Sequence, residues 1–392
     1  MRRTCLIFPI LAGIIMSVIL TGPIAAEEAK DITIGRIITI PSTVLAEKRI
    51  IWLSLPEGYE KNKQPYPVLY LLDGPTHFLY AKGMVDFFAR NGLMPQMIIV
   101  AIANTQRGRD FTPSQTEKIK NSGGAGKFLS FLKTELIPYV DGQYRTAPLR
   151  LLFGHSLCGM FSTYTLFQEP DLFAAHITAS PYLQYDDDYV LKVAADAMQQ
   201  KMELPRYLSV NWGNEPAYDA PIKRLDAMLK KHAPAAFRWQ VHHLTDETHG
   251  TIPFQSLSKG LLDFFSKWRF SAKLADKGVK GIKEYYASLQ EAYGYKVPVS
   301  EVLVNNLGYK LLFAKKVDDA IAVFRYNVDV FPGSANVYDS LGEGLQAKGL
   351  YQEAQKNYRI AVEKGTATKA FGLKIFKEHL KAVEELIKTK QG

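Results

Sequence analysis

The stretch LRLLFGHSLCGMFSTYTLF, from Leu149 to Phe167, runs from an apolar segment through a short polar turn into a helix-like segment. Ser156 stands in the polar turn and matches a nucleophile elbow, a sharp strand-to-helix turn that exposes a serine hydroxyl. The usual pattern is G-x-S-x-G, whereas this chain has Gly154 before the serine and Cys158 in the last position, followed by Gly159. The turn indicates a nucleophile if the rest of the chain supplies its partners.

Segments on both sides of this turn predict the fold class. Runs rich in β-branched and aromatic residues alternate with helix-period segments, which is typical of an α/β fold, a mostly parallel sheet with helices on both faces. The first two runs have no helix between them and predict an antiparallel edge. The expected strands cover residues 32–40, 49–55, 68–72, 97–103, 150–153, 175–179, 206–211 and 237–244. The expected helices cover residues 126–139, 160–168, 189–200, 220–232 and 254–270.

From residue 272 the pattern changes to helices alone and contains an internal repeat with a period of 34 residues. That period and its residue types are typical of tetratricopeptide helix pairs, which bury their apolar faces only by stacking. The sequence predicts an α/β domain at 27–271 and a helical domain at 272–392, with repeats at about 301–334 and 335–368 and a capping helix at 366–388. The recurring residues are Leu307-Gly308 and Leu341-Gly342, Ala320 and Ala354, and Phe324 and Tyr358.

The first 26 residues have the layout of a secretory signal peptide. Arg2 and Arg3 precede the apolar run Leu6–Leu20, and the small residues Ala25 and Ala26 follow, so we expect cleavage before position 27. An uncleaved membrane anchor is the alternative. No later stretch approaches the ~20 apolar residues that a spanning helix needs. The sequence therefore predicts an exported protein, periplasmic or extracellular, without stable membrane insertion.

Charge and cysteine content narrow the class of protein. The net charge is +9, but the lysines are scattered and form no basic stripe, so nucleic-acid binding is not expected. Of the two cysteines, Cys5 would leave with the signal peptide, which leaves Cys158 without a disulfide partner. The acidic run Asp186–Asp188 does not fit a calcium loop, and no metal site is predicted.

Candidates for the base and the acid follow the serine along the chain. A serine hydroxyl needs a base to accept its proton and a carboxylate to orient that base, and on this kind of sheet the order is serine, acid, histidine. His249 lies in LTDETHGTIPF, just past an expected strand, and is the candidate base. Glu215, in RYLSVNWGNEPAYD, is the candidate acid, with Asp219 as the alternative. Either carboxylate would otherwise only cap the helix that follows.

A tetrahedral intermediate would also need N–H donors for its oxyanion. We expect one donor to be the backbone N–H of Leu157, at the start of the helix after the elbow. The second is expected from the segment after the strand PVLYLLDG. Because Pro75 has no N–H, that donor would be Gly74 or Thr76.

Three basic side chains are candidates for substrate contacts: His155, His77 and Arg107. The segment NTQRGRDFTPS has two interpretations. We expect Arg109 and Asp110 to form a structural ion pair that orders the long loop. Arg107 either joins that network or reaches the cleft and binds an acidic portion of the substrate.

With these pieces assembled, the chain resembles the putative-esterase family of α/β-hydrolases, the group that contains esterase D, feruloyl esterases, mycolyltransferases and periplasmic siderophore esterases. The resemblance implies esterase activity without a metal or organic cofactor. It carries over Ser156 as nucleophile, His249 as base and Glu215 as acid. The matching stretches are YPVLYLLDGPTHF (66–78), NTQRGRDFTPS (104–114), GHSLCGMFS (154–162), SPYLQYD (180–186), NWGNE (211–215) and ETHGTIP (247–253).

The sequence therefore predicts an exported serine carboxylic-ester hydrolase that works through an acyl-enzyme. Its expected substrates are small-molecule esters, either short-chain or aromatic esters or a trilactone siderophore. An acyl transferase, which uses an alcohol in place of water, is the alternative with the same chemistry. The alternative from another class is a non-catalytic scaffold whose repeats bind a protein partner. The repeats are also candidates for self-association.

Overall fold

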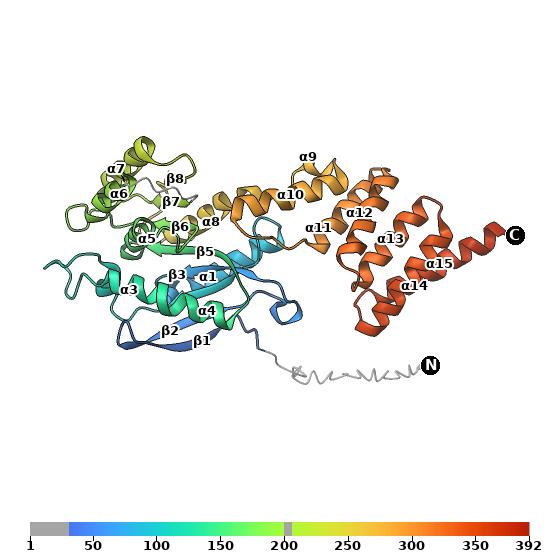
Figure 1. Cartoon of the computed structure of the whole chain (residues 1–392), viewed down its shortest axis with the longest axis horizontal. Helices are drawn as coiled ribbons and strands as arrows, with labels where there is room; N and C mark the ends of the chain where they lie inside the picture. Colours follow the sequence, from blue (N-terminus) through green and yellow to red (C-terminus); the bar gives the residue numbers. More distant parts are fainter. Residues whose placement is uncertain (1–30, 200–205, 392) are drawn as a thin grey trace, which may run out of the picture. The chain divides into compact units, whose positions relative to one another are not determined.

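The apolar runs form one eight-stranded sheet in the order β1-β2-β4-β3-β5-β6-β7-β8 (Figure 1). The computed structural model describes residues 31–199 and 206–391. Strand β2 runs antiparallel to β1 and β4, and the other neighbouring strands are parallel, so the predicted α/β class and antiparallel edge are confirmed. The strands are β1 (Arg36–Ser42), β2 (Glu47–Ser54), β3 (Tyr66–Leu71), β4 (Ile98–Ile102), β5 (Thr146–His155), β6 (Ala175–Ala179), β7 (Tyr207–Trp212) and β8 (Arg238–His243).

Helices cover both faces of this sheet. Helices α1 and α8 share an apolar cluster with strands β3 to β6 on one face, and α3 and α5 pack on the other face. The helices of this part are α1 (Gly74–Arg90), α2 (Arg107–Phe111), α3 (Ala125–Phe131), α4 (Ile137–Gln143), α5 (Leu157–Gln168), α6 (Tyr189–Gln199), α7 (Pro216–His232) and α8 (Ile252–Phe264).

Two of the predicted helices are not continuous over their predicted length. The segment predicted as one helix at 126–139 is divided by a π-helical turn, Leu132–Leu136, which joins α3 to α4. The helix predicted at 254–270 ends at Phe264, and a short 3-10 turn, Ser266–Trp268, follows. Phe264 and Phe265 both pack into the core where this helix ends.

Helix α1 was not predicted from the sequence, which placed its first residues in a loop. Pro75 lies in the first turn, where a missing N–H costs no helical hydrogen bond. Further along, Phe78, Ala81, Val85 and Phe88 recur at helical spacing, and all four are buried against the sheet. This burial fixes α1 at the carboxyl end of β3, beside the elbow strand β5.

The C-terminal part contains helices alone among the described residues. Helix α11 packs on α12 and α13 packs on α14, and these two pairs occupy the two predicted repeats. Gly308 approaches the ring of Phe324 so closely that a Cβ would lie 2.3 Å from it, and Gly342 repeats this contact with Tyr358 at 2.5 Å. The helices are α9 (Ala272–Ala275), α10 (Gly278–Tyr293), α11 (Glu301–Phe313), α12 (Val317–Val330), α13 (Ala335–Ala347), α14 (Tyr351–Thr368) and α15 (Leu373–Gln391).

Two boundaries in this part differ from the sequence prediction. The predicted capping helix at 366–388 begins later, because α14 continues to Thr368 and the chain turns at Lys369, which has a left-handed backbone. The apolar cluster under α8 also continues past residue 271, since Tyr285, Leu289 and Tyr293 of α10 belong to it.

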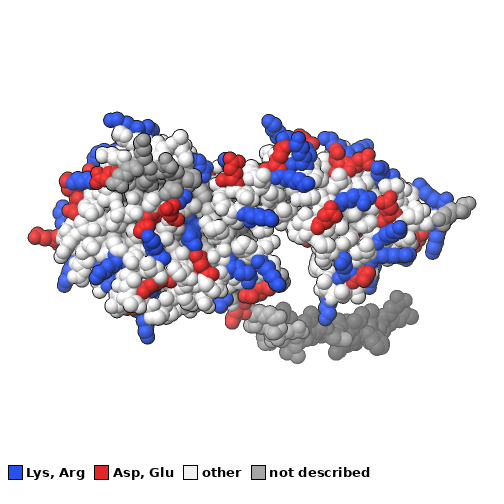
Figure 2. All heavy atoms as spheres, viewed as in Figure 1, with Lys and Arg blue, Asp and Glu red and all other residues white. Residues whose placement is uncertain are grey.

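The surface carries charges of both signs. On the face shown in Figure 2, Lys and Arg side chains are interspersed with Asp and Glu side chains. None of the described helices combines the length and the apolar character that crossing a bilayer requires. The predicted signal peptide, residues 1–26, lies outside the described residues.

Candidate active site

The elbow forms although Cys158 replaces the usual glycine. Strand β5 ends at His155 and α5 begins at Leu157, so Ser156 alone makes the turn, with φ 59° and ψ −117°. This backbone is unfavourable for a residue with a side chain, and Ser156 N–H is held by the Ala179 carbonyl at 2.9 Å. The close approach in this turn falls on Gly154, where a Cβ would lie 2.2 Å from the Cys158 carbonyl oxygen.

Cys158 is a core residue of this turn. Its side chain is fully buried, and burial raises the pKa of its thiol well above the usual value. A thiol in that state carries almost no thiolate at neutral pH, so it is a poor nucleophile. Ser156 is therefore the nucleophile candidate that the geometry presents.

The structure brings Glu215 and His249 together. Glu215 follows β7 and His249 follows β8, and a hydrogen bond joins Glu215 Oε1 to His249 Nδ1. The second oxygen, Oε2, accepts hydrogen bonds from the Ser180 hydroxyl and from the Gly213 N–H, the latter at 3.2 Å. The alternative acid, Asp219, instead pairs with Lys223 at 2.7 Å on the helix surface. The carboxylate that orients the imidazole is thus that of Glu215.

His249 also lies beside the elbow. Its ring centroid is 4.4 Å from that of His155, the residue before the serine, and 5.4 Å from that of Tyr218. Burial raises the pKa of the Tyr218 hydroxyl, and the nearby Ser156 hydroxyl opposes that effect. In the described part of the chain, no hydrogen bond joins Ser156 Oγ to His249. Such contacts commonly tighten only in the substrate complex.

Two backbone N–H groups at helix starts remain candidates for the oxyanion hole. Leu157 begins α5 and Gly74 begins α1, at the carboxyl ends of the neighbouring parallel strands β5 and β3. Neither N–H donates to another described residue. The N–H of the other candidate, Thr76, donates to the Asp73 carbonyl at 3.0 Å in the turn that starts α1, which favours Gly74 as the second donor.

The three basic candidates for substrate contact lie at different depths. His77 is 2% exposed, and its Nδ1 is bonded to the Tyr80 hydroxyl at 2.7 Å, so it supports the floor of the site and does not line it. His155 lies between His77 and His249, with ring centroids 6.1 and 4.4 Å away. Burial lowers the pKa of both His77 and His155 to about 4, which keeps the two rings neutral at pH 7.

Arg107 belongs to the floor and reaches the surface. Its Nε is 2.9 Å from Asp73 Oδ1, its Nη2 is 3.0 Å from Asp73 Oδ2, and Nη2 also donates to the His155 carbonyl at 3.2 Å. Burial alone would raise the pKa of Asp73, but these bonds outweigh it and the pKa is lowered. The Arg107 side chain remains 35% exposed, so it combines the structural and the cleft-facing interpretations.

The neighbouring Arg109 is structural, as expected for its pairing with Asp110. Its guanidinium contacts Asp110 and Glu47, both at 2.7 Å. Asp110 also binds Arg49 at 2.8 Å, and the side chains of Asp110 and Arg49 are 1% and 0% exposed. This buried network fixes helix α2, which carries Arg107.

Sequence reasoning missed Tyr218 and Ser180. Tyr218 lies one helical turn after Glu215, in the same quoted stretch, and its aromatic ring was an available signal. Ser180 follows β6 and bonds a carboxylate 35 residues away. That contact depends on the order of β6 and β7 in the sheet, which the sequence does not specify.

A mostly parallel sheet with a serine elbow after β5 and an acid–histidine pair after β7 and β8 defines the class of α/β-hydrolases. Residues 42–292 match the family model described as "Putative esterase", and the chain belongs to that family. It is therefore a carboxylic ester hydrolase.

Individual relatives agree with this assignment. The chain is 26% identical over 272 residues to the siderophore triacetylfusarinine C esterase of Aspergillus fumigatus, an alignment that covers 57% of this chain and 91% of that protein. The solved IroE-like serine hydrolase from Shewanella oneidensis is 25% identical, with a TM-score of 0.66, over 75% of this chain and 98% of that one.

One further structure shares the fold over more of the chain. An uncharacterised protein from Capnocytophaga ochracea, 17% identical with a TM-score of 0.61, covers 90% of this chain and 99% of its own. A match of that extent cannot be confined to the region of the family model, so it includes C-terminal helices.

Proposed function

We propose that the protein hydrolyses carboxylic esters through a Ser156–His249–Glu215 triad and an acyl-enzyme. The observation that carries the proposal is the bond between Glu215 and His249 at the same sheet edge as the strained elbow serine. A carboxylate on Nδ1 fixes the tautomer in which Nε2 is free to accept a proton. The support that Glu215 receives from Ser180 and Gly213 holds it in that position.

The mechanism follows from these positions. His249 Nε2 accepts the Ser156 proton as Oγ bonds to the ester carbonyl carbon, and the carbonyl electrons move to the oxygen. The N–H groups of Leu157 and Gly74 stabilise that oxyanion. The C–O bond of the ester then breaks, and the alcohol leaves with the proton from His249. Water, deprotonated by the same imidazole, cleaves the acyl-enzyme and restores the serine.

Labelling with a fluorophosphonate tests this proposal. Wild type should acquire one label on Ser156, and Ser156→Ala should lose both the label and the hydrolysis of p-nitrophenyl acetate and butyrate. Because the remaining groups alone can give roughly 10³–10⁴ over water, the assay must resolve rates above that background. Ser130→Ala, on α3, is the matched control and should behave as wild type. Wild-type rates in Ser156→Ala would refute the triad.

For the substrate we propose a trilactone siderophore. Two observations support this class: a similar protein is named a siderophore esterase, and the Arg107 guanidinium, although paired with Asp73, stays 35% exposed near the elbow. An iron-loaded trilactone presents anionic iron ligands, to which the exposed N–H groups of that guanidinium can donate hydrogen bonds. Iron-loaded and iron-free trilactones should be opened by wild type and left intact by Ser156→Ala.

The products separate the remaining alternatives. Mass spectrometry of the reaction with added alcohol distinguishes hydrolysis, which gives the free acid, from acyl transfer, which gives a new ester. Intact trilactone alongside turnover of aryl esters would remove the siderophore while leaving the esterase chemistry in place.

Export and a tetratricopeptide module complete the proposal. Export rests on the layout of residues 1–26, and N-terminal sequencing of the secreted protein should find Glu27 first. The repeat assignment is supported by the equivalent contacts of Gly308 with Phe324 and of Gly342 with Tyr358. Sizing the protein with and without residues 301–392 tests whether these helices mediate self-association.

A further inference from the structure

Three metal-ligating side chains meet between α13 and α15, away from the elbow. Asp339 and Glu343 lie one turn apart on the same face of α13, and His379 lies on α15. His379 Nδ1 is 3.0 Å from one Asp339 oxygen and 3.1 Å from the other. One ligand atom from each of the three residues lies within 4.8 Å of the others.

The cluster carries more negative than positive charge. Asp339 is 4% exposed, and it pairs with His379. Among the described residues, no basic side chain forms an ion pair with Glu343. Two carboxylates this close, one of them buried, favour a bound cation.

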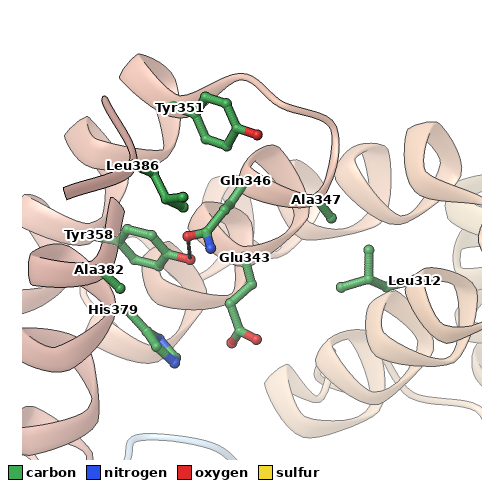
Figure 3. A pocket seen from close by; sticks show the side chains of 9 residues that line it. All are labelled: Leu312, Glu343, Gln346, Ala347, Tyr351, Tyr358, His379, Ala382 and Leu386. Atoms are coloured by element: carbon green, nitrogen blue, oxygen red, sulfur yellow. Dashed lines mark hydrogen bonds between the residues drawn. The ribbon is translucent and has the colours of Figure 1, made fainter. Parts of the chain in front are cut away.

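A cavity opens directly onto these groups. It has a volume of about 380 Å³, and Glu343 and His379 line it together with Gln346, Tyr351 and Tyr358. Figure 3 shows the Glu343 carboxylate and the His379 imidazole at the same end of this cavity. A cation held there would therefore have a free side that faces the cavity.

The surrounding hydrogen bonds would orient the ligands. The Tyr309 hydroxyl bonds to Glu343 Oε1 at 2.6 Å, which leaves Oε2 available. Metal sites commonly depend on such outer partners, which fix the orientation of the ligating carboxylate.

We propose that Asp339, Glu343 and His379 bind one Zn²⁺ ion or a similar borderline divalent transition ion. His379 Nδ1 and one oxygen from each carboxylate supply three ligands, and the fourth position opens into the cavity. Imidazole with carboxylates is a donor set suited to zinc, whereas magnesium and calcium prefer oxygen ligands alone. Binding at Nδ1 replaces the hydrogen bond between His379 and Asp339, leaves the imidazole proton on Nε2, and links α15 to α13.

Titration of the full-length protein tests the site. After treatment with a chelator, calorimetry with ZnCl₂ should find one ion per chain, and the thermal midpoint should rise with zinc. MgCl₂ at the same concentration should leave the midpoint unchanged. Co²⁺ should give visible ligand-field bands that are lost in His379→Ala.

Variants distinguish the site from adventitious binding. His379→Ala and Glu343→Gln should each abolish the zinc-dependent rise, and Tyr309→Phe should weaken binding by about 10- to 100-fold. The matched control is Glu378→Gln, whose exposed carboxylate lies next to His379 in the chain and should bind zinc as wild type does. Circular dichroism checks that each variant folds. Equal zinc affinity in wild type, His379→Ala and Glu343→Gln would overturn the proposal, as would the absence of zinc binding by wild type.

Discussion

Replacing Glu215 by glutamine is the most informative perturbation of the proposed triad, because it changes charge and hydrogen-bond donors with little change in shape. In the structure, Glu215 Oε1 bonds His249 Nδ1, and Oε2 accepts from Ser180 and Gly213. A glutamine that keeps its oxygen on Ser180 and Gly213 would place its NH₂ group against Nδ1. That donor favours the tautomer with the proton on Nε2, which cannot accept a proton from Ser156.

The magnitude follows from that loss of the active tautomer. In serine hydrolases, substitution of the orienting carboxylate by its amide lowers kcat by about 10⁴. Each factor of ten corresponds to about 1.4 kcal/mol, so Glu215→Gln should raise the barrier by about 5 kcal/mol. The Glu215 side chain is 9% exposed, so water is poorly placed to replace the carboxylate.

The assay is steady-state hydrolysis of p-nitrophenyl butyrate, with urea denaturation to confirm that the variant folds. Asp219→Asn is the matched control, since that carboxylate pairs with Lys223 and the alternative assignment would make it essential. It should stay within about twofold of wild type, because a surface ion pair contributes little. A folded Glu215→Gln with near-wild-type kcat/KM, or a large loss in Asp219→Asn, would refute the assignment of the acid.

Three further predictions concern the framework. Gly154→Ala should lower kcat/KM by at least about 10²-fold, because the new Cβ meets the Cys158 carbonyl at 2.2 Å and displaces the elbow. Asp110→Ala should lower the free energy of unfolding by about 3 kcal/mol, since it removes the buried carboxylate that pairs with the fully buried Arg49 and leaves that guanidinium with Glu47, which is 18% exposed. Burial lowers the pKa of His176 to about 3, whereas the unfolded chain binds a proton at this histidine once the pH falls below about 6.5. The free energy of unfolding should therefore decrease by up to about 1.4 kcal/mol for each pH unit below about 6.5. His176→Gln should remove this part of the pH dependence.

Controls for these predictions come from the same chain. Gly83→Ala lies within α1 with no atom near its new Cβ, so it should keep full activity, and an equal loss in both glycine variants would contradict the elbow argument. Glu57→Ala breaks an exposed pair with Arg90 and should cost less than about 1 kcal/mol. A pH dependence of stability that is the same in wild type and His176→Gln would show that this histidine does not contribute.

The fold followed from the sequence wherever local patterns were sufficient. Buried strands such as β6, predicted and observed at 175–179, are continuous apolar runs between turns. Helix α1 was missed because Gly74, Pro75 and Gly83 weaken its helical pattern, and burial against the sheet overrides that weakness. The strand order β2-β4-β3-β5 depends on long-range pairing, which no local pattern encodes.

The candidate site was predicted to a similar extent. The order of Ser156, Glu215 and His249 along the chain was enough to nominate them, and the structure places Glu215 rather than Asp219 against the histidine. The zinc candidate gave no such signal. His379 lies 40 residues after Asp339 and on another helix, so only the packing of α15 on α13 brings the two together.

The residues of the proposed triad follow strands at different positions in the sheet, and this affects how the enzyme would lose activity on partial unfolding. Ser156 follows an interior strand, whereas His249 follows β8, the last strand of the sheet, whose residues are all at least partly exposed. Mild heat or denaturant that unfolds β8 locally would move the His249 imidazole away from Ser156 while the interior strands remained folded. Catalytic activity would then be lost at a lower denaturant concentration than the unfolding transition measured by circular dichroism. Activity would therefore detect this local unfolding before the circular dichroism signal changes.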